Sequence, residues 1–357
     1  MKIIHCADVH LGSKMDSRLP REKALVRRGE ILSAFGRMVN FAKHEGVRAI
    51  LISGDLFDSD RPFKKDKEFF YGTVEENPEI DFFYLRGNHD TKESYSISGL
   101  ENLKCFSDEW CTYHLDGVAI SGIELSSKNC ESLYSTLSLE SEEKNIVMLH
   151  GAVSDSFGED LINVRALRER SIDYLALGHI HKGGAGKLDG RGIYAYPGCL
   201  EGRGFDECGE HGFLLLDTEV GFSPLFVKNS VREITECEVD ISGTKNTYEA
   251  FSRALNQIKP KKSDILRINL VGEINFSDGR IESVIEEYFS EHCFFSSVKD
   301  KTFSSENLSL AAEEVSIKGE FLRLVLASEL DNEEKKEIIS TGLSALAGRE
   351  IEVRGEG

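Results

Sequence analysis

The sequence contains no long hydrophobic run. None of its apolar stretches approaches the roughly 20 residues that a membrane-spanning helix requires. Its N-terminus also lacks the successive basic, apolar and small-residue zones of a signal peptide. We therefore expect a globular cytoplasmic protein with no membrane partner.

Paired cysteines are missing as well. The eight cysteines are scattered along the chain, and no two of them form a C-x-x-C motif, so neither a zinc knuckle nor a redox dithiol is indicated. We expect free thiols in a reducing compartment. The phosphate-binding motif G-x-x-x-x-G-K-[ST] is also absent from the sequence, so this chain is not expected to hydrolyse ATP itself.

Positive charge is scarce. The chain has 43 Lys and Arg against 62 Asp and Glu, which gives a net charge of −19. The excess of acidic residues extends to the C-terminal part, because residues 226–357 contain 17 basic and 25 acidic residues. A nucleic-acid-binding protein usually presents a basic face. A polyanionic substrate would therefore have to be attracted by a local basic patch, by bound cations or by a partner chain.

What the sequence does contain is an alternation of apolar runs and helical periodicities. Strands are predicted over 2–7, 49–53 and 81–85, with helices over 21–45 and from Pro62 to about Val74 between them. This β-α-β-α-β order is typical of a layered α/β sheet.

The C-terminal part has a different pattern. Strands near 192–195, 212–218 and 224–228 complete a first domain, and a small α/β pattern without clustered His or Asp follows. The sequence therefore predicts two domains, residues 1–228 and residues 235–357.

Two further strands are predicted over 145–149 and 174–177. Polar side chains follow these two and the strands over 2–7, 49–53 and 81–85, at the point where each strand ends. These side chains are Asp8, His10, Asp55, Asn88, His150, His179 and His181. The carboxyl ends of strands in α/β folds are where ligands bind. Seven mixed nitrogen and oxygen donors are too many for one tetrahedral ion and suit two ions that share a carboxylate.

Two metal ions about 3.5–4 Å apart form a clamp for phosphoryl transfer. His89 is not needed as a ligand and follows Asn88, so we expect it to protonate the leaving group, with Asp90 orienting its ring. Arg203, in a Gly-rich loop, is a candidate contact for a substrate phosphate. The remaining histidines are expected to be structural: His5, His44, His114, His211 and His292.

These motifs resemble those of the calcineurin-like metallophosphoesterases, whose series D-x-H, G-D, G-N-H-D/E, H and G-H-x-H is complete here. Within that family the chain is similar to the bacterial SbcD-type DNA repair nucleases. The likeness is carried by residues 7–12, 54–58 and 196–207, the last of which resembles a YhaO-like branch.

The resemblance implies a four-layer α/β/β/α sandwich followed by a smaller α/β capping domain that orients DNA. It implies two Mn²⁺ ions, with iron, zinc or magnesium as alternatives. One ion would be held by Asp8, His10, Asp55 and His181, and the other by Asp55, Asn88, His150 and His179. It also implies a homodimer bound to an SMC-like ATPase of the SbcC type, and an enzyme that cuts DNA as an exonuclease and endonuclease in repair.

Two other functions stay open at this point. The acidic composition favours a phosphodiesterase of the same superfamily that acts on small molecules. A non-catalytic binding scaffold is the third candidate, but scaffolds on this fold typically lose metal ligands, and none is missing here.

Overall fold

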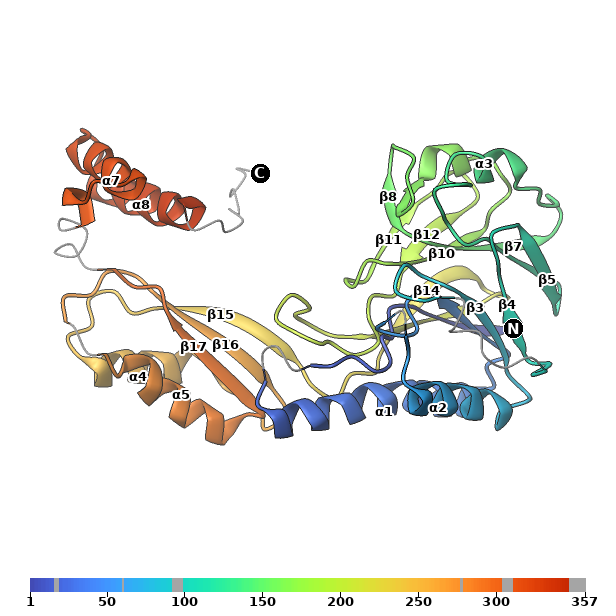
Figure 1. Ribbon diagram of the computed structural model, residues 1–357, viewed down its shortest axis with the longest axis horizontal. Helices are drawn as coiled ribbons and strands as arrows, with labels where there is room; N and C mark the ends of the chain where they lie inside the picture. Colours follow the sequence, from blue (N-terminus) through green and yellow to red (C-terminus); the bar gives the residue numbers. More distant parts are fainter. Residues whose placement is uncertain (16–18, 60, 92–98, 277–278, 304–310, 347–357) are drawn as a thin grey trace. The chain divides into compact units, whose positions relative to one another are not determined.

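The computed structural model describes residues 1–357 except 16–18, 60, 92–98, 277–278, 304–310 and 347–357 (Figure 1). It divides into two compact units, Met1–Thr235 and Glu236–Gly357. The predicted domains, 1–228 and 235–357, place the border in the same stretch of the chain, and the roles assigned to them stay predictions.

The first unit contains two six-stranded sheets. The first has the order β14-β13-β1-β2-β3-β4, in which β1 to β4 are parallel and β13 and β14 are antiparallel. Its strands are β1 (Lys2–Cys6), β2 (Ala49–Ser53), β3 (Asp81–Leu85), β4 (Leu103–Cys105), β13 (Gly212–Asp217) and β14 (Gly221–Lys228). Because β1, β2 and β3 are parallel, their C-terminal ends lie at one edge of the sheet.

The second sheet has the order β11-β12-β10-β7-β6-β5, with β6, β7, β10 and β12 parallel. Its strands are β5 (Cys111–Leu115), β6 (Val118–Gly122), β7 (Lys144–His150), β10 (Tyr174–Gly178), β11 (Gly184–Lys187) and β12 (Ile193–Tyr196). A two-stranded ribbon of β8 (Ala152–Ser154) and β9 (Leu161–Asn163) follows β7.

Alternating apolar side chains hold these layers together. In β1, Ile3 packs between the two sheets, whereas the next residue, Ile4, packs toward the outer helices. Those helices are α1 (Arg21–Glu45) and α2 (Lys64–Glu75), which bury Phe35 and Phe70 against the first sheet. Side chains two apart in a strand share a face, so one strand contributes to both cores.

The outer face of the second sheet is covered by shorter elements. Leu149 and Leu175 pack with the short helix α3 (Leu133–Thr136) and with the 3-10 turn Val164–Leu167. The predicted four-layer α/β/β/α sandwich is therefore confirmed. The helices of its last layer are short, with four residues each.

The second unit is a smaller α/β fold. It has a three-stranded sheet with a helical layer and a helical hairpin with its own apolar cluster. Its elements are β15 (Ile234–Asp240), α4 (Thr247–Gln257), β16 (Ile265–Val271), α5 (Ile281–His292), β17 (Phe295–Asp300), α7 (Ile317–Ala327) and α8 (Asn332–Leu346). Among the helices that the structure describes, none combines the length and apolar character that a membrane span needs.

Gly178 lies where the end of β10 meets the end of β2. A Cβ atom placed there would lie 1.9 Å from the carbonyl oxygen of Ser53 and 2.9 Å from the Cβ of Ala7. Because neither atom belongs to a flexible side chain, Gly178→Ala must displace backbone. We expect it to lower the free energy of unfolding by about 1–3 kcal/mol in urea titrations.

The matched control is Gly190→Ala, an exposed position where a Cβ would meet no atom within 4 Å. This change should alter the free energy of unfolding by less than about 0.5 kcal/mol. Equal stabilities for the two variants would contradict the close approach at Gly178.

Candidate metal centre

The structure brings all seven predicted ligands to one edge of the sandwich. Asp8 and His10 follow β1, Asp55 follows β2, Asn88 follows β3, His150 ends β7, and His179 and His181 follow β10. Both sheets deliver their parallel strands to this edge, so residues as distant as 8 and 181 become neighbours.

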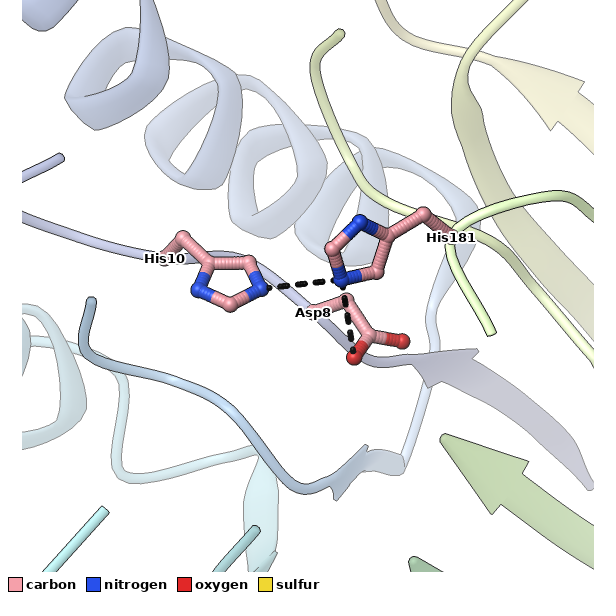
Figure 2. Close-up of side chains that lie close together, drawn as sticks. All are labelled: Asp8, His10 and His181. Atoms are coloured by element: carbon pink, nitrogen blue, oxygen red, sulfur yellow. Dashed lines mark hydrogen bonds and ion pairs between the residues drawn. The ribbon is translucent and has the colours of Figure 1, made fainter. Parts of the chain in front are cut away.

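The first group of donors consists of Asp8, His10 and His181 (Figure 2). One ligand atom from each lies within 4.8 Å of the others. The two Nε2 atoms of His10 and His181 are 3.2 Å apart, and His181 Nε2 lies 3.9 Å from an oxygen of Asp8. Side chains from the segments after β1 and after β10 therefore converge on one point.

The second group consists of Asp8, Asp55 and His150, whose donor atoms also lie within 4.8 Å of one another. Asn88 Oδ1 lies 3.0 Å from His150 Nε2 and 3.2 Å from His179 Nδ1, so Asn88 stands between these two rings.

Asp55 contacts both groups. Its Oδ2 atom lies 3.9 Å from His10 Nε2 and 3.5 Å from His150 Nε2. This is the position that a carboxylate shared between two ions would need.

Four of the seven residues have a left-handed backbone that is uncommon outside glycine. Their φ angles are 51° at Asp8, 50° at His10, 52° at Asp55 and 99° at His179. Such residues cost about 1–3 kcal/mol each and cluster at functional sites. Hydrogen bonds from Asp8 N–H to Gly54 O and from His10 N–H to Asp55 O, each 3.0 Å, help to hold the two loops in this form.

Gly54, in the Gly54-Asp55 motif, is required by a tertiary contact with His150. A Cβ atom on Gly54 would lie 2.1 Å from the His150 ring, and the φ of Gly54 is +94°. The glycine therefore leaves room for a ligand from the opposite sheet.

Burial makes the charges of the centre strongly interdependent. Asp8 and Asp55 are each 1% exposed. Burial raises the pKa of Asp8 to about 6, and the nearby positive charge of His150 only partly offsets this effect. Burial also lowers the pKa of His150, but the hydrogen bond and charge of Asp55 outweigh it and raise the pKa of His150 to about 9.

This donor set fits divalent cations. Two buried carboxylates that lie close together need positive charge near them. His10 is available as a neutral ligand, because burial lowers its pKa to about 4. Imidazole nitrogen together with carboxylate and amide oxygen suits ions such as manganese, iron and zinc.

Two carboxylates that the sequence did not single out orient the histidines. Glu207 Oε1 lies 2.7 Å from His181 Nδ1, and Asp58 Oδ1 lies 3.2 Å from His10 Nδ1. His150 is held instead by the carbonyl oxygen of Ser53, 2.8 Å from its Nδ1. Ligating histidines usually have such a partner on the second nitrogen. Their only sequence signal is that Asp58 and Glu207 lie in the segments resembling SbcD-type proteins.

The predicted role of Arg203 needs correction. Its guanidinium contacts Asp58 Oδ1 and Glu207 Oε1, both at 2.8 Å, and its side chain is only 19% exposed. Because two carboxylates already match its charge, Arg203 holds the orienting residues together and does not present a free cation to a phosphate.

The predicted role of Asp90 is also wrong. Its carboxylate accepts hydrogen bonds from the backbone N–H groups of Leu56, Phe57 and Gly87 at 3.0–3.2 Å, so it fixes two loops and not the His89 ring. His89 itself is exposed next to Asn88, and its backbone N–H donates to Asp55 Oδ1 at 3.0 Å.

The histidines expected to be structural do have partners outside the centre. His5 contacts the Tyr174 hydroxyl, and His211 contacts the Glu207 carbonyl oxygen. His44 and His114 pair with surface glutamates, and His292 stacks on Tyr288. All eight cysteines are free.

Known proteins resemble this chain over much of its length. Residues 1–183, about half of the chain, match the family described as calcineurin-like phosphoesterase. The uncharacterized metallophosphoesterase YhaO of Bacillus subtilis is 29% identical over 269 residues, which cover 70% of this chain and 66% of YhaO.

More distant relatives extend this picture. The DNA double-strand break repair protein Mre11 of Sulfolobus acidocaldarius is 24% identical over 296 residues, which cover 77% of this chain and 76% of that protein. Among solved structures, a dimetal phosphatase from Danio rerio has a TM-score of 0.39 at 13% identity, covering 60% of this chain and 91% of its own.

Glu207→Gln should weaken metal binding, because an amide orients His181 less strongly than a carboxylate does. We expect the Mn²⁺ affinity of one site to fall by about 10–100-fold in isothermal titration calorimetry. Glu210→Gln, in the same loop but paired with Lys228 at the surface, should bind Mn²⁺ like the unaltered protein.

The raised pKa of His150 predicts the pH dependence of the metal-free protein. A group whose folded pKa is raised stabilises the fold fully below its unfolded pKa, here 6.5, and loses that contribution as pH rises to about 9. In EDTA, the free energy of unfolding should therefore fall by up to about 3 kcal/mol between pH 6.5 and 9.

The contribution of His150 can be separated from that of other groups. His150→Gln should abolish this part of the slope, whereas His114→Gln, at an exposed histidine, should retain it. If the slope were the same in all three proteins, His150 would not be its source.

Proposed function

Because the chain belongs to the calcineurin-like phosphoesterase family, we propose that it hydrolyses phosphodiester bonds at a two-metal centre. The observation that carries this proposal is the convergence of two donor groups that share the buried Asp8, with Asp55 in contact with both and Asn88 between His150 and His179. One ion would be held by Asp8, His10, Asp55 and His181, and the other by Asp55, Asn88, His150 and His179. Manganese is the expected ion.

Divalent ions bound in such a centre lower the pKa of water and neutralise charge on a phosphate. The chain's own residues hold the site in shape. Asp8 accepts the backbone N–H of His179 at 3.0 and 3.1 Å through its two oxygens, which ties the end of β10 to the end of β1. The residues that would hold the ions are therefore fixed in place before a substrate arrives.

His89 is the general acid of this proposal. Its side chain is exposed, and its ring centroid lies 5.2 Å from that of His10, at the border of the first donor group. Its backbone N–H donates to Asp55 Oδ1 at 3.0 Å, which anchors the residue next to the centre. From there it donates a proton to the leaving oxygen. Asp90 supports this step indirectly by fixing the turn that carries His89.

DNA is the substrate that we propose, in an exonuclease and endonuclease reaction of DNA repair. The support is the match with proteins described as DNA double-strand break repair proteins, together with the SbcD-like segments of the sequence. A homodimer and an ATPase partner of the SbcC type belong to the same proposal. Such a partner would supply the positive surface that a chain of net charge −19 has in short supply.

A phosphodiesterase acting on small molecules is the second candidate, and one cavity favours it. A cavity of about 860 Å³ opens beside Asn88 and His150. Within the described part of the chain its lining holds two basic side chains, Arg86 and Lys128, and five acidic ones. Arg86 is paired with Glu124 at 2.7 Å, so a long polyanion would find little free positive charge there. A non-catalytic scaffold is disfavoured, because every donor is present.

The leaving group can reveal the role of His89. His89→Gln should lower the Mn²⁺-dependent cleavage rate of linear DNA by about 10²–10⁴-fold, because an alkoxide needs a proton to leave. Cleavage of bis(p-nitrophenyl) phosphate should fall much less, since p-nitrophenolate leaves without one. End-labelled DNA on gels and absorbance of p-nitrophenolate provide the two measurements.

His114→Gln serves as the matched control, because His114 lies in β5 on the surface and should leave both rates unchanged. Equal losses on both substrates would remove His89 as general acid. If the unaltered protein cleaved cyclic nucleotides and aryl diesters but not DNA, the small-molecule function would replace the nuclease.

A further inference from the structure

An arginine–glutamate pair is buried in the first unit. Arg27, in α1, is 1% exposed, and Glu201 is 2% exposed. Both terminal nitrogens of Arg27 donate to Glu201 Oε1 at 3.1 Å, and one of them also donates to the carbonyl oxygen of Gly202. Removing one partner of a buried ion pair is destabilising, because the other charge stays buried with less compensation.

Glu201 joins three separate parts of the first unit. Its Oε1 binds α1 through Arg27, while its Oε2 accepts Arg37 at 3.3 Å and the backbone N–H of Val231 at 3.2 Å. Arg37 also donates to the carbonyl oxygen of Asn229 at 3.0 Å. Glu201 thereby fixes its own segment against the helix and against the chain that follows β14.

The segment that Glu201 fixes is residues 199–207, and it carries the groups that orient the metal ligands. At its start, the backbone N–H of Cys199 donates to the His181 carbonyl oxygen at 3.0 Å. The backbone of Cys199 also forms an isolated parallel β-bridge with Ala7, the residue before Asp8. At its end, Glu207 contacts His181 Nδ1 at 2.7 Å.

Arg203 lies two residues beyond Glu201 and connects the two orienting carboxylates. It reaches Glu207 within the segment and Asp58 outside it. Asp58 in turn contacts His10. A displacement of the 199–207 segment would therefore disturb both histidines of the first donor group, whereas His150, held by Ser53, would keep its partner.

We infer that Arg27 and Glu201 are positioning residues for the ion bound by His10 and His181. They act at a distance by locking the 199–207 segment, and they contact neither the ion nor the substrate. The inference rests on the metal centre proposed above. It gives the buried pair a role beyond fold stability, because loosening it should weaken one metal site selectively.

The test is calorimetric titration of chelator-treated protein with Mn²⁺. The unaltered protein should bind two ions per chain. In Arg27→Met the Mn²⁺ affinity of one site should fall about 10–100-fold, as is typical when a residue that orients a metal ligand is changed. The affinity of the second site should change by less than about threefold. Adding His181→Gln should reduce the effect of Arg27→Met on the weakened site, because only the part that acts through Asp58 and His10 remains.

A stability control comes from another arginine pair in the same unit. Arg191 donates to Asp173 at 2.9 and 2.8 Å, away from the 199–207 segment. Arg191→Met should lower the melting temperature and leave both Mn²⁺ affinities unchanged. Arg27→Lys keeps the buried charge, so it should fold even if Arg27→Met does not, and it should show a smaller loss at the same site.

The outcomes separate the two proposals. If the unaltered protein bound no pair of Mn²⁺ ions, the metal centre itself would be wrong. If it bound two ions and both Arg27 variants bound them with unaltered affinity, only the positioning role would be overturned. Equal weakening of both sites would also overturn it, since the pair would then act on the whole fold.

Discussion

Two buried carboxylates, Asp8 and Asp55, lie close together where β1 and β2 end, and the rest of the site depends on this arrangement. Like charges that are out of contact with water are unfavourable unless positive charge is near. In the chain alone, His150 supplies part of it, which is why its pKa is raised. Divalent cations would supply it fully. The bound ions would also account for the left-handed backbone at these residues, because the free energy of ion binding can offset the cost of unfavourable backbone conformations.

Around this pair, side chains that can donate a hydrogen bond alternate with carboxylates. His10 is followed by Asp58, then Arg203, then Glu207, then His181, each in contact with the next. The arginine in this series neutralises two carboxylates that would otherwise repel each other, so it works as part of the framework. The Arg27–Glu201 pair follows the same principle, with the buried Glu201 bound by Arg27, by Arg37 and by the backbone N–H of Val231.

The acidic composition of the chain and a phosphate substrate are compatible for a local reason. The centre gathers acidic and neutral donors, and bound cations reverse the sign of the potential at that point. Away from it, the cavity beside Asn88 stays acidic. Attraction of a polyanion thus depends on the ions in the site and on surfaces that other chains would add. The second unit contributes no group of three metal-binding side chains among its described residues.

The sequence by itself determined the fold class and placed the seven donors at strand ends. Apolar alternation and helical spacing are local properties, and the C-terminal ends of parallel strands in one sheet share an edge, so the strand pattern predicts that polar residues at those ends meet. The packing of the two sheets then brings His150, His179 and His181 to the edge that carries Asp8 and Asp55. Only the tertiary structure decided what surrounds them. Arg203 and Asp58 are 145 residues apart, and Arg27 and Glu201 are 174 apart. No local sequence pattern predicts such contacts, since they depend on how segments far apart in the sequence pack together. The roles of Arg203 and Asp90 escaped prediction for the same reason: a charged residue beside a site can equally face a ligand or a neighbouring loop, and only packing determines which.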